Sequence, residues 1–386
     1  MKIQQNIWEQ DSSWEVFGDE KSLNPQLVIF FGNKDALEDG KRFEELRALY
    51  PDAILVGGTT AGEIIGEEVL DDSVVATAIE FEKTRLELKT VLVTDFMDSF
   101  EAGQSLARQF DPEGLKTLFV LSDGHLVNGS NLVQGLVTVL GKDIIITGGL
   151  AGDGPNFQET LVSANTPPES GRIAVVGLYG QNIKVGHGSV GGWDPFGPER
   201  IITKSEANVL YELDGKPALE LYKTYLGEEA ENLPGSALLF PLTIRQKDQK
   251  GTGTVRTILS VNEEENSMTF AGDMPEGNVT QLMMANFDHL VDGAAEAALK
   301  AKDQQETETL GDHLAIMISC VGRKIVLGQR TADEVEAVTE ILSDIVGEGV
   351  GQMGFYSYGE ISPHVETGSC ELHNQTMTIT YLAEQV

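Results

Sequence analysis

The chain has 386 residues, 41% of them apolar and 23% charged, which is long enough for two or three globular domains with cores of their own. Basic residues number 27 and acidic residues 61, giving a formal net charge of −34. This charge argues against nucleic acid and anionic membrane surfaces as partners, because both repel a strongly acidic protein.

The first predicted unit begins with a buried apolar strand at 27–31. A helix over 34–49 follows, and a second apolar strand at 54–56 leads into the glycine-rich segment 57–63, which ends in an acid. Residues 74–93 contain two runs rich in β-branched side chains and predict a hairpin.

The same order of elements recurs further along the chain. Its parts are a strand at 118–121, a helix over 130–140, a strand at 144–146 that leads into the segment 148–153, and a hairpin within 173–185. Leu27 precedes Gly57 by as many residues as Leu118 precedes Gly148. The first half is therefore predicted to contain a duplicated β-α-β-β-β unit.

The second half repeats the order once more. A strand is predicted within 313–319, and Thr331 with Glu334 forms a capping-box pattern ahead of a helix. Strands at 351–361 and 375–382 follow.

Three of the predicted strand ends place a glycine next to an acid, at Glu63, Asp153 and Glu360. Glycine allows the chain to turn where a side chain would clash, so part of this recurrence is architectural.

The predicted fold class is mixed α/β (α+β), with two domains of mixed or antiparallel sheets covered by helices. Residues 186–198 are rich in glycine and proline and predict a break in regular structure. We place the domain junction near residue 215, which gives an N-terminal extension (1–24), a first domain (25–215) and a second domain (216–386).

No catalytic motif is evident, so we expect a protein that is not an enzyme. Residues 186–191 match the dinucleotide-binding pattern, but Pro195 follows where that fold requires a helix to begin. Walker, Gly-x-Ser-x-Gly and His-Glu-x-x-His patterns are absent from the sequence. The enzyme alternative would use Glu63 or Glu360 as a general base in a cleft between the domains.

The histidines leave two alternatives open. His364, Cys370 and His373 lie close together, but their spacing matches no common zinc motif, so we predict no metal site. His187 lies in the glycine-rich segment, where a haem plane could approach the backbone; the alternative is a histidine in a turn.

Polar and aromatic residues gather near the end of the second half. Tyr356 and Tyr358 share one face of a predicted strand, and Arg323 ends the neighbouring strand; Glu360 and Asn374 are nearby in the pattern. An arginine with tyrosines and a carboxylate can hold a small zwitterion or carboxylate. The alternative is an ordinary sheet face carrying an Arg–Glu pair.

Several motifs together resemble the FIST proteins, which have an N-terminal and a C-terminal FIST domain. The motifs are VGGTTAGEI, GWDPFGP, YELDGKPALELY, SCVGRKIVLGQR, GFYSYGEISP and LHNQTMTIT. The resemblance implies a sensory module of signal transduction that binds small ligands such as amino acids. The ligand-binding residues we predict are Thr59, Thr60, Glu63, Asp153, Trp193, Arg323, Tyr356, Tyr358, Glu360 and Asn374.

The resemblance also implies a partner. Some bacterial members are similar to haem-binding nitric oxide sensors that regulate a histidine kinase, for which His187 is the candidate haem ligand here. The sequence shows no output region, so we expect a separate signalling partner such as a histidine kinase. No apolar run reaches the about 18 residues of a membrane helix, and Cys320 and Cys370 give no disulfide framework. We therefore expect a cytoplasmic location.

Overall fold

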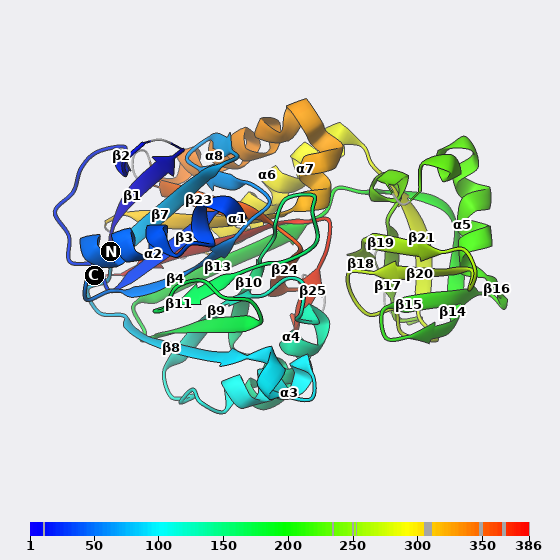
Figure 1. Ribbon diagram of the computed structural model, residues 1–386, viewed down its shortest axis with the longest axis horizontal. Helices are drawn as coiled ribbons and strands as arrows, with labels where there is room; N and C mark the ends of the chain where they lie inside the picture. Colours follow the sequence, from blue (N-terminus) through cyan, green and yellow to red (C-terminus); the bar gives the residue numbers. More distant parts are fainter. Residues whose placement is uncertain are drawn as a thin grey trace.

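Two parts make up the molecule, a larger body and a small β domain (Figure 1). The computed structural model describes residues 1–386 except 11, 234, 249–250, 252, 305–310, 347–349, 365–367 and 386. The small domain spans residues 194–284, and the described residues on either side of it form the body. The two chain ends lie together on the side of the body away from the small domain.

The first sheet of the body has six strands in the order β11-β4-β3-β7-β1-β2. These are β11 (Val162–Ala164), β4 (Ile54–Thr59), β3 (Leu27–Gly32), β7 (Ser73–Glu80), β1 (Lys2–Glu9) and β2 (Glu15–Phe17). Strands β3 and β4 are parallel and are connected through the helices α1 (Lys34–Leu37) and α2 (Lys41–Leu49). Strand β1, from the segment predicted as an N-terminal extension, pairs with β7 along its whole length.

The second sheet has the order β25-β24-β10-β9-β12-β8. Its strands are β25 (Cys370–His373), β24 (Gly359–Pro363), β10 (Ile145–Leu150), β9 (Leu115–Ser122), β12 (Arg172–Tyr179) and β8 (Arg85–Leu92). Helix α4 (Gly129–Leu140) connects the parallel strands β9 and β10 and packs against α3 (Ser99–Ala107), which the short turn η1 (Val93–Asp95) precedes. Gly103 and Gly135 lie at this contact, where a Cβ would strike the facing helix backbone.

The third sheet has the order β13-β26-β22-β23-β5-β6. Its strands are β13 (Ile183–Val190), β26 (Met377–Glu384), β22 (His313–Cys320), β23 (Val350–Ser357), β5 (Glu63–Ile65) and β6 (Glu68–Leu70). The parallel strands β22 and β23 are connected by α7 (Val321–Leu327), η4 (Gly328–Arg330) and α8 (Thr331–Val346). Helix α6 (Phe287–Asp303) packs on β13 and β26 through a stripe of buried alanines.

All three sheets have the same pattern of connections. In each, a central strand pairs with a parallel strand and, on its other side, with a returning antiparallel strand. The outer neighbour of each parallel strand comes from another sheet's chain segment: β11 follows β10 but pairs with β4, β24 follows β23 but pairs with β10, and β5 follows β4 but pairs with β23. The mixed α/β fold class is therefore confirmed. A residue-by-residue superposition of the two predicted repeats stays a prediction.

The paired glycines of the sequence have a packing role. A Cβ on Gly57 would lie 2.3 Å from the carbonyl oxygen of Phe30, and one on Gly148 would lie 1.9 Å from that of Val120. A Cβ on Gly354 would likewise lie 1.9 Å from the carbonyl oxygen of Met317. Each parallel strand therefore needs glycine where it crosses closest to the central strand.

Both predicted hairpins are wrong. Strands β7 and β8 belong to the first and second sheets, and β12 and β13 belong to the second and third. The short loops between them carry the chain from one sheet to the next around the shared core, which local β-propensity cannot distinguish from a hairpin turn.

The predicted break at 186–198 is also wrong, because most of it lies in β13 and in β14 (Asp194–Glu206). Its glycines allow α6 to approach: a Cβ on Gly188 would lie 2.0 Å from the carbonyl oxygen of Ala297. His187 is accordingly a strand residue that pairs with Thr380 of β26, not a residue of an open loop.

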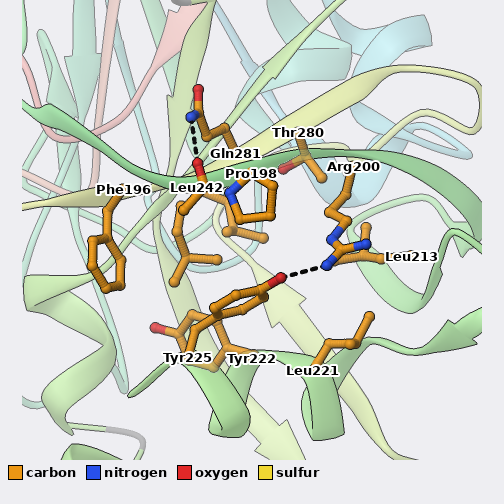
Figure 2. Close-up of a pocket in the computed structure, with 12 residues that line it drawn as sticks. Phe196, Pro198, Arg200, Leu213, Leu221, Tyr222, Tyr225, Leu242, Thr280 and Gln281 are labelled. Atoms are coloured by element: carbon orange, nitrogen blue, oxygen red, sulfur yellow. Dashed lines mark hydrogen bonds between the residues drawn. The ribbon is translucent and has the colours of Figure 1, made fainter. Parts of the chain in front are cut away.

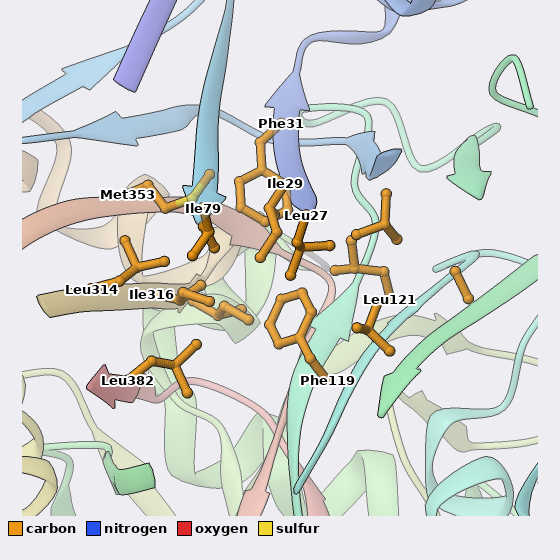
Figure 3. Close-up of a cluster of buried hydrophobic side chains, with 14 of the residues drawn as sticks. Leu27, Ile29, Phe31, Ile79, Phe119, Leu121, Leu314, Ile316, Met353 and Leu382 are labelled. Carbon is orange, nitrogen blue, oxygen red and sulfur yellow. The ribbon is translucent and has the colours of Figure 1, made fainter. Parts of the chain in front are cut away.

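Apolar side chains from all three sheets meet in one core (Figure 3). Ile29 comes from the first sheet, Phe119 from the second and Ile316 from the third, and all three are buried. Burying each such side chain contributes about 1.5–3 kcal/mol, so this shared core holds the three sheets together as one body.

The small domain is a strongly bent eight-stranded sheet, β18-β17-β21-β14-β15-β20-β19, with β16 beside β15. The strands other than β14 are β18 (Thr254–Arg256), β17 (Leu242–Arg245), β21 (Val279–Met284), β15 (Val209–Leu213), β20 (Ser267–Phe270), β19 (Ile258–Asn262) and β16 (Lys216–Pro217). Helix α5 (Ala218–Leu226) covers it, and the turns η2 (Gly227–Asn232) and η3 (Gly235–Leu239) follow. The domain has a core of its own around Tyr222 and Phe270.

In the part of the chain that the structure describes, no helix has the length and apolar character needed to cross a lipid bilayer.

Candidate functional site

A cleft of about 750 Å³ lies between the body and the small domain. The body contributes the loop after β9, the end of β10, the start of α7 and Tyr358; the small domain contributes β19, β20 and the loops beside them. The described residues that line it are Gly124, His125, Leu126, Val127, Asn128, Leu150, Phe157, Asn208, Gly235, Leu238, Thr257, Ile258, Leu259, Ser260, Thr269, Phe270, Ala271, Gly272, Cys320, Val321, Gly322 and Tyr358. This volume lies within the range of about 300–1,000 Å³ that is usual for small-molecule sites.

A few polar contacts join the two parts at the edge of the cleft. The guanidinium of Arg256 donates to the carbonyl oxygen of Leu372 at 2.9 Å, and Asn128 Nδ2 donates to Asp273 Oδ1 at 3.2 Å. Where the chain passes between the parts, Asp194 accepts from Asn286 and pairs with His289 Nδ1 at 2.8 Å. Apolar side chains also pack across this junction, among them Trp193, Val255 and Leu290, so a small hydrophobic cluster connects the two parts in addition to these hydrogen bonds.

The aromatic rings of Phe157 and Tyr358 are stacked on the body side of the cleft, with their centroids 4.5 Å apart and their planes at 14°. The carboxylate of Asp153 accepts the backbone N–H groups of Phe157 and Gln158 at 2.8 and 2.9 Å and also the hydroxyl of Tyr358. Burial and the contact with Asp153 raise the pKa of Tyr358, so its hydroxyl stays protonated. Sequence reasoning singled out Asp153 and Tyr358 but missed Phe157, whose position depends on both.

Cys320 forms one corner of the cleft, at the end of β22. The backbone N–H groups of Gly322, Arg323 and Gln375 face its sulfur. Burial, with a smaller effect of Glu360, nevertheless raises the pKa of the thiol to about 12. At neutral pH the group is therefore a thiol and a poor nucleophile.

We expect iodoacetamide to label Cys320 very slowly in the folded protein at pH 8. The raised pKa lowers the thiolate fraction by on the order of a thousandfold relative to an ordinary cysteine. Mass spectrometry of native and urea-denatured samples measures this, and the denatured chain, in which both cysteines react, is the control. Rapid labelling of native Cys320 would contradict the raised pKa.

Arg323 is buried away from the cleft and bound to protein groups. Its Nε and Nη2 donate to Glu334 Oε2 at 2.9 and 2.7 Å, and Nη2 also donates to the carbonyl oxygen of Leu290 at 2.7 Å. Glu334 accepts in addition from Ser319 and Tyr356, both at 2.9 Å. The carboxylate partner of Arg323 is thus Glu334, and the predicted capping box is wrong because this carboxylate points into the body.

The segment 57–63 is buried and bonded within the body. Thr59 accepts the N–H of Leu161 at 3.0 Å, and Glu63 accepts the hydroxyls of Thr60 and Ser73, the latter at 2.7 Å. Burial raises the pKa of Glu63 to about 7 in spite of these hydrogen bonds. The structure places Thr59, Thr60 and Glu63 inside the body rather than on the cleft wall.

A second buried acid lies behind the corner at Cys320. Glu360 accepts the Ser357 hydroxyl at 2.7 Å and the Thr376 hydroxyl at 3.0 Å, and burial raises its pKa to about 8. The side-chain amides of Asn374 and Gln375 are buried nearby without a hydrogen-bond partner among the described residues. The Gln375 amide lies against Gly322 of the cleft wall, so it is one layer removed from the cleft.

Of the ligand-binding residues that the sequence predicted, Tyr358 is the one that lines the cleft. Asp153 supports it, Tyr356 bonds to Glu334, and Trp193 is buried at the junction of the two parts, where its Nε1 donates to the Gln375 carbonyl at 2.8 Å. Thr257, on the cleft wall of the small domain between β18 and β19, was missed by sequence reasoning, since a single threonine between two strands carries no local signal.

A second hollow lies inside the small domain, between α5 and the sheet (Figure 2). Apolar and aromatic side chains enclose it, and Arg200 reaches Tyr225 across one end. Its free volume of about 10 Å³ corresponds to a single water molecule at most, so it cannot hold a ligand.

Comparison with protein families agrees with the motifs. The FIST N domain matches residues 26–216, and the FIST C domain matches residues 218–363. The chain belongs to the FIST family. FIST domains are associated with sensing in signal transduction. In this FIST protein the small domain combines the end of the first matched segment with the start of the second, and β5 of the first extends the sheet of β23 from the second.

An uncharacterised protein of Methanocaldococcus jannaschii is 26% identical to this FIST chain over 255 residues. The match covers 59% of the chain and 47% of the relative, so the chain spans about half the length of that protein. Among solved structures, a cyanuric acid hydrolase from A. caulinodans is 10% identical, with a TM-score of 0.30, over 94% of this chain and 91% of its own. A second cyanuric acid hydrolase structure is 11% identical, with a TM-score of 0.27, over 74% of this chain and 99% of its own. Scores this low carry no argument about fold or activity.

The haem alternative places its ligand outside the cleft. His187 of β13 binds Gln304 through its backbone N–H and C=O, at 3.1 and 2.9 Å, and burial lowers its pKa. The histidine that lines the cleft is His125, so a haem in the cleft would not meet His187. Among the described residues, no group of three or more His, Cys, Asp or Glu side chains is arranged to hold a metal ion. Cys370 donates to the carbonyl of Ile146, and His373 bonds to that of Ser362.

Proposed function

We propose that this FIST protein is an intracellular sensor that binds a small molecule in the cleft between body and small domain. The observation that carries the proposal is the cleft itself, whose walls come from both parts. A ligand that touches both parts binds one relative orientation better than others, and this difference in affinity is what shifts a conformational equilibrium. Occupancy can then be transmitted as a change in the angle between the parts.

The family resemblance favours an amino-acid-like ligand, and the volume of the cleft suits a molecule of that size. The signal would pass to a separate protein such as a histidine kinase, and the net charge of −34 favours a partner with a basic surface. In this proposal the buried acids Glu63 and Glu360 are structural and the protein is not an enzyme. A haem-binding nitric oxide sensor remains the alternative; a haem absorption band in protein purified from haem-sufficient cells distinguishes it.

We expect binding of a standard L-amino acid or its carboxamide to change the distance between body and small domain. Fluorophores on Met97→Cys and Glu264→Cys report that distance by energy transfer, because both positions are exposed and both native cysteines are buried. Leu259→Trp places a large ring in the cleft and should abolish the response.

Ile325→Trp is the matched control, since Leu259 is 44% exposed and Ile325 is 46% exposed but does not line the cleft. A response that survives Leu259→Trp would place the ligand elsewhere, and the absence of any response across the panel would count against the sensor.

A further inference from the structure

Phe157 is an exposed aromatic ring that the fold holds in an unfavourable position. Its side chain is 40% exposed at the cleft, and its backbone has φ +52°, a left-handed conformation that costs a bulky residue free energy. Phe157 keeps this backbone conformation because the carboxylate of Asp153 accepts the backbone N–H groups of Phe157, Gln158 and Glu159. The hydroxyl of Tyr358 adds a further bond, accepting the Phe157 N–H at 3.2 Å.

The ring that stacks on Phe157 from behind is fixed as well. Tyr358 is anchored through its hydroxyl to Asp153 and to the carbonyl of Gly154, so the flat Phe157–Tyr358 pair is rigid. Tyr358 packs against apolar residues of the body, and both rings line the cleft. A preorganised aromatic surface of this kind favours a flat partner, because stacking then requires no further ordering of the protein.

The wall of the cleft offers hydrogen bonds, and the charged groups beside it, Arg256 and Asp273, are already bonded to protein groups. Among the described residues that line it there is no Lys, Arg, Asp or Glu, although 88 of the residues of the chain (27 basic plus 61 acidic) are of these types. The small domain contributes the hydroxyls of Thr257, Ser260 and Thr269, and the Thr257 hydroxyl is buried without a partner in the described part of the chain. An ion entering this cleft would meet no Lys, Arg, Asp or Glu among the described lining residues, whereas a neutral polar group would find hydrogen-bond partners there.

We propose that the cleft binds an uncharged planar ring that carries an amide-type group. The ring stacks on Phe157 of the body, and the amide exchanges hydrogen bonds with hydroxyls of the small domain, Thr257 first. This inference rests on the proposed ligand-binding function and replaces its amino-acid-like ligand with a neutral aromatic one. Contacts to Phe157 on one side and to Thr257 on the other also explain how one small molecule would hold the two parts together.

Three probes of similar size test the flat ring, the amide group and the absence of charge separately. Benzamide has the flat ring and the neutral amide, benzoate replaces the amide by a charge, and cyclohexanecarboxamide keeps the amide but lacks the flat ring. Binding of each to the full chain is measured by ligand-observed NMR titration at millimolar concentrations. We expect benzamide to bind at least about tenfold more tightly than benzoate, because no Lys or Arg among the described residues lines the cleft to pair with the carboxylate.

The variant Phe157→Leu keeps an apolar side chain but removes the ring, and should weaken benzamide binding by about two- to tenfold while leaving cyclohexanecarboxamide unchanged. Phe287→Leu is the matched control, because Phe287 is 43% exposed and does not line the cleft. Thr257→Val removes the unpartnered hydroxyl with little change in shape and should weaken both amides. Circular dichroism confirms that each variant is folded.

The outcomes separate this inference from the proposed function. Equal binding of benzamide and benzoate, no effect of Phe157→Leu, or no binding of benzamide at all overturns the neutral planar ligand. If L-amino acids still bind and Leu259→Trp still abolishes their binding, the sensor stands and this inference alone has failed. If Leu259→Trp changes the binding of no L-amino acid and of none of the three probes, the proposed sensor function and this inference have both failed.

Discussion

Replacing Arg323 with alanine is expected to lower the free energy of unfolding by about 3–5 kcal/mol, since it leaves the buried carboxylate of Glu334 without its cation. Both side chains are fully buried, and the ion pair between them measures 2.7 Å. The carbonyl oxygen of Leu290 loses a donor as well. Urea denaturation of the two proteins at neutral pH measures the difference.

Arg330→Ala is the matched control in the same part of the chain. Arg330 also pairs with acids, Asp288 and Asp333, but its side chain is 42% exposed, so water replaces the lost contacts and stability should stay close to that of the wild type. If Arg323→Ala leaves the stability unchanged but abolishes ligand binding, Arg323 binds the ligand, as the sequence alone suggested. A large loss of stability for both variants would instead indicate a general dependence on surface charge.

The sequence identified Arg323 as a residue that needs a carboxylate, but it could not identify which one. Glu360 is closer to the motif of aromatic residues, whereas Glu334 lies in a pattern typical of a helix start. The choice between them is made by the packing of α8 against β22 and β23, which places Glu334 beside Ser319 and Tyr356. Such a pairing depends on tertiary structure, and local patterns do not encode it.

The strands were predictable where apolar runs are long, as at β3, β9 and β22, and a helix was predicted between the two strands of each pair that is parallel in the structure. The sheet to which each strand belongs was not predictable. A short loop after β7 or β12 can close a hairpin or cross to another sheet, and the shared core around Ile29, Phe119 and Ile316 decides between these. Phe157 was missed for a related reason, since its exposure depends on the contact of Asp153 with Tyr358.

The stability of the protein is expected to fall as the pH rises from about 4.5 to about 8, and Glu360 should account for a large part of the fall. Burial raises the pKa of Glu360 to about 8 from an ordinary value of 4.5. The folded state therefore holds a proton that the unfolded state has released, and stability decreases with pH throughout this interval. At about 1.4 kcal/mol per pKa unit, the contribution of Glu360 amounts to about 5 kcal/mol below pH 4.5 and vanishes above pH 8.

Glu360→Gln isolates this effect, because glutamine resembles the neutral acid: its side-chain oxygen can still accept from Thr376, and its Nε2 can donate to the hydroxyl of Ser357. The stability of the variant minus that of the wild type should be near zero at pH 4.5, should rise with pH, and should level off near pH 8. All other titrating groups, including the buried His373, cancel in this difference when their surroundings are unchanged. A difference that does not vary with pH would mean that Glu360 is ionised in the folded protein.

Glu63→Gln provides an independent comparison in the same experiment. Burial raises the pKa of Glu63 to about 7, so its difference curve should level off about one pH unit earlier and at about 3 kcal/mol. The hydrogen bonds from Thr60 and Ser73 favour the charged form of Glu63, and so does the ammonium of Lys324, which bonds to the carbonyl of Ala61. Replacing Lys324 by methionine should therefore raise the pH at which the stability difference for Glu63→Gln levels off. The corresponding pH for Glu360→Gln should stay the same. Movement of both curves together would show that the two buried acids titrate as one coupled pair.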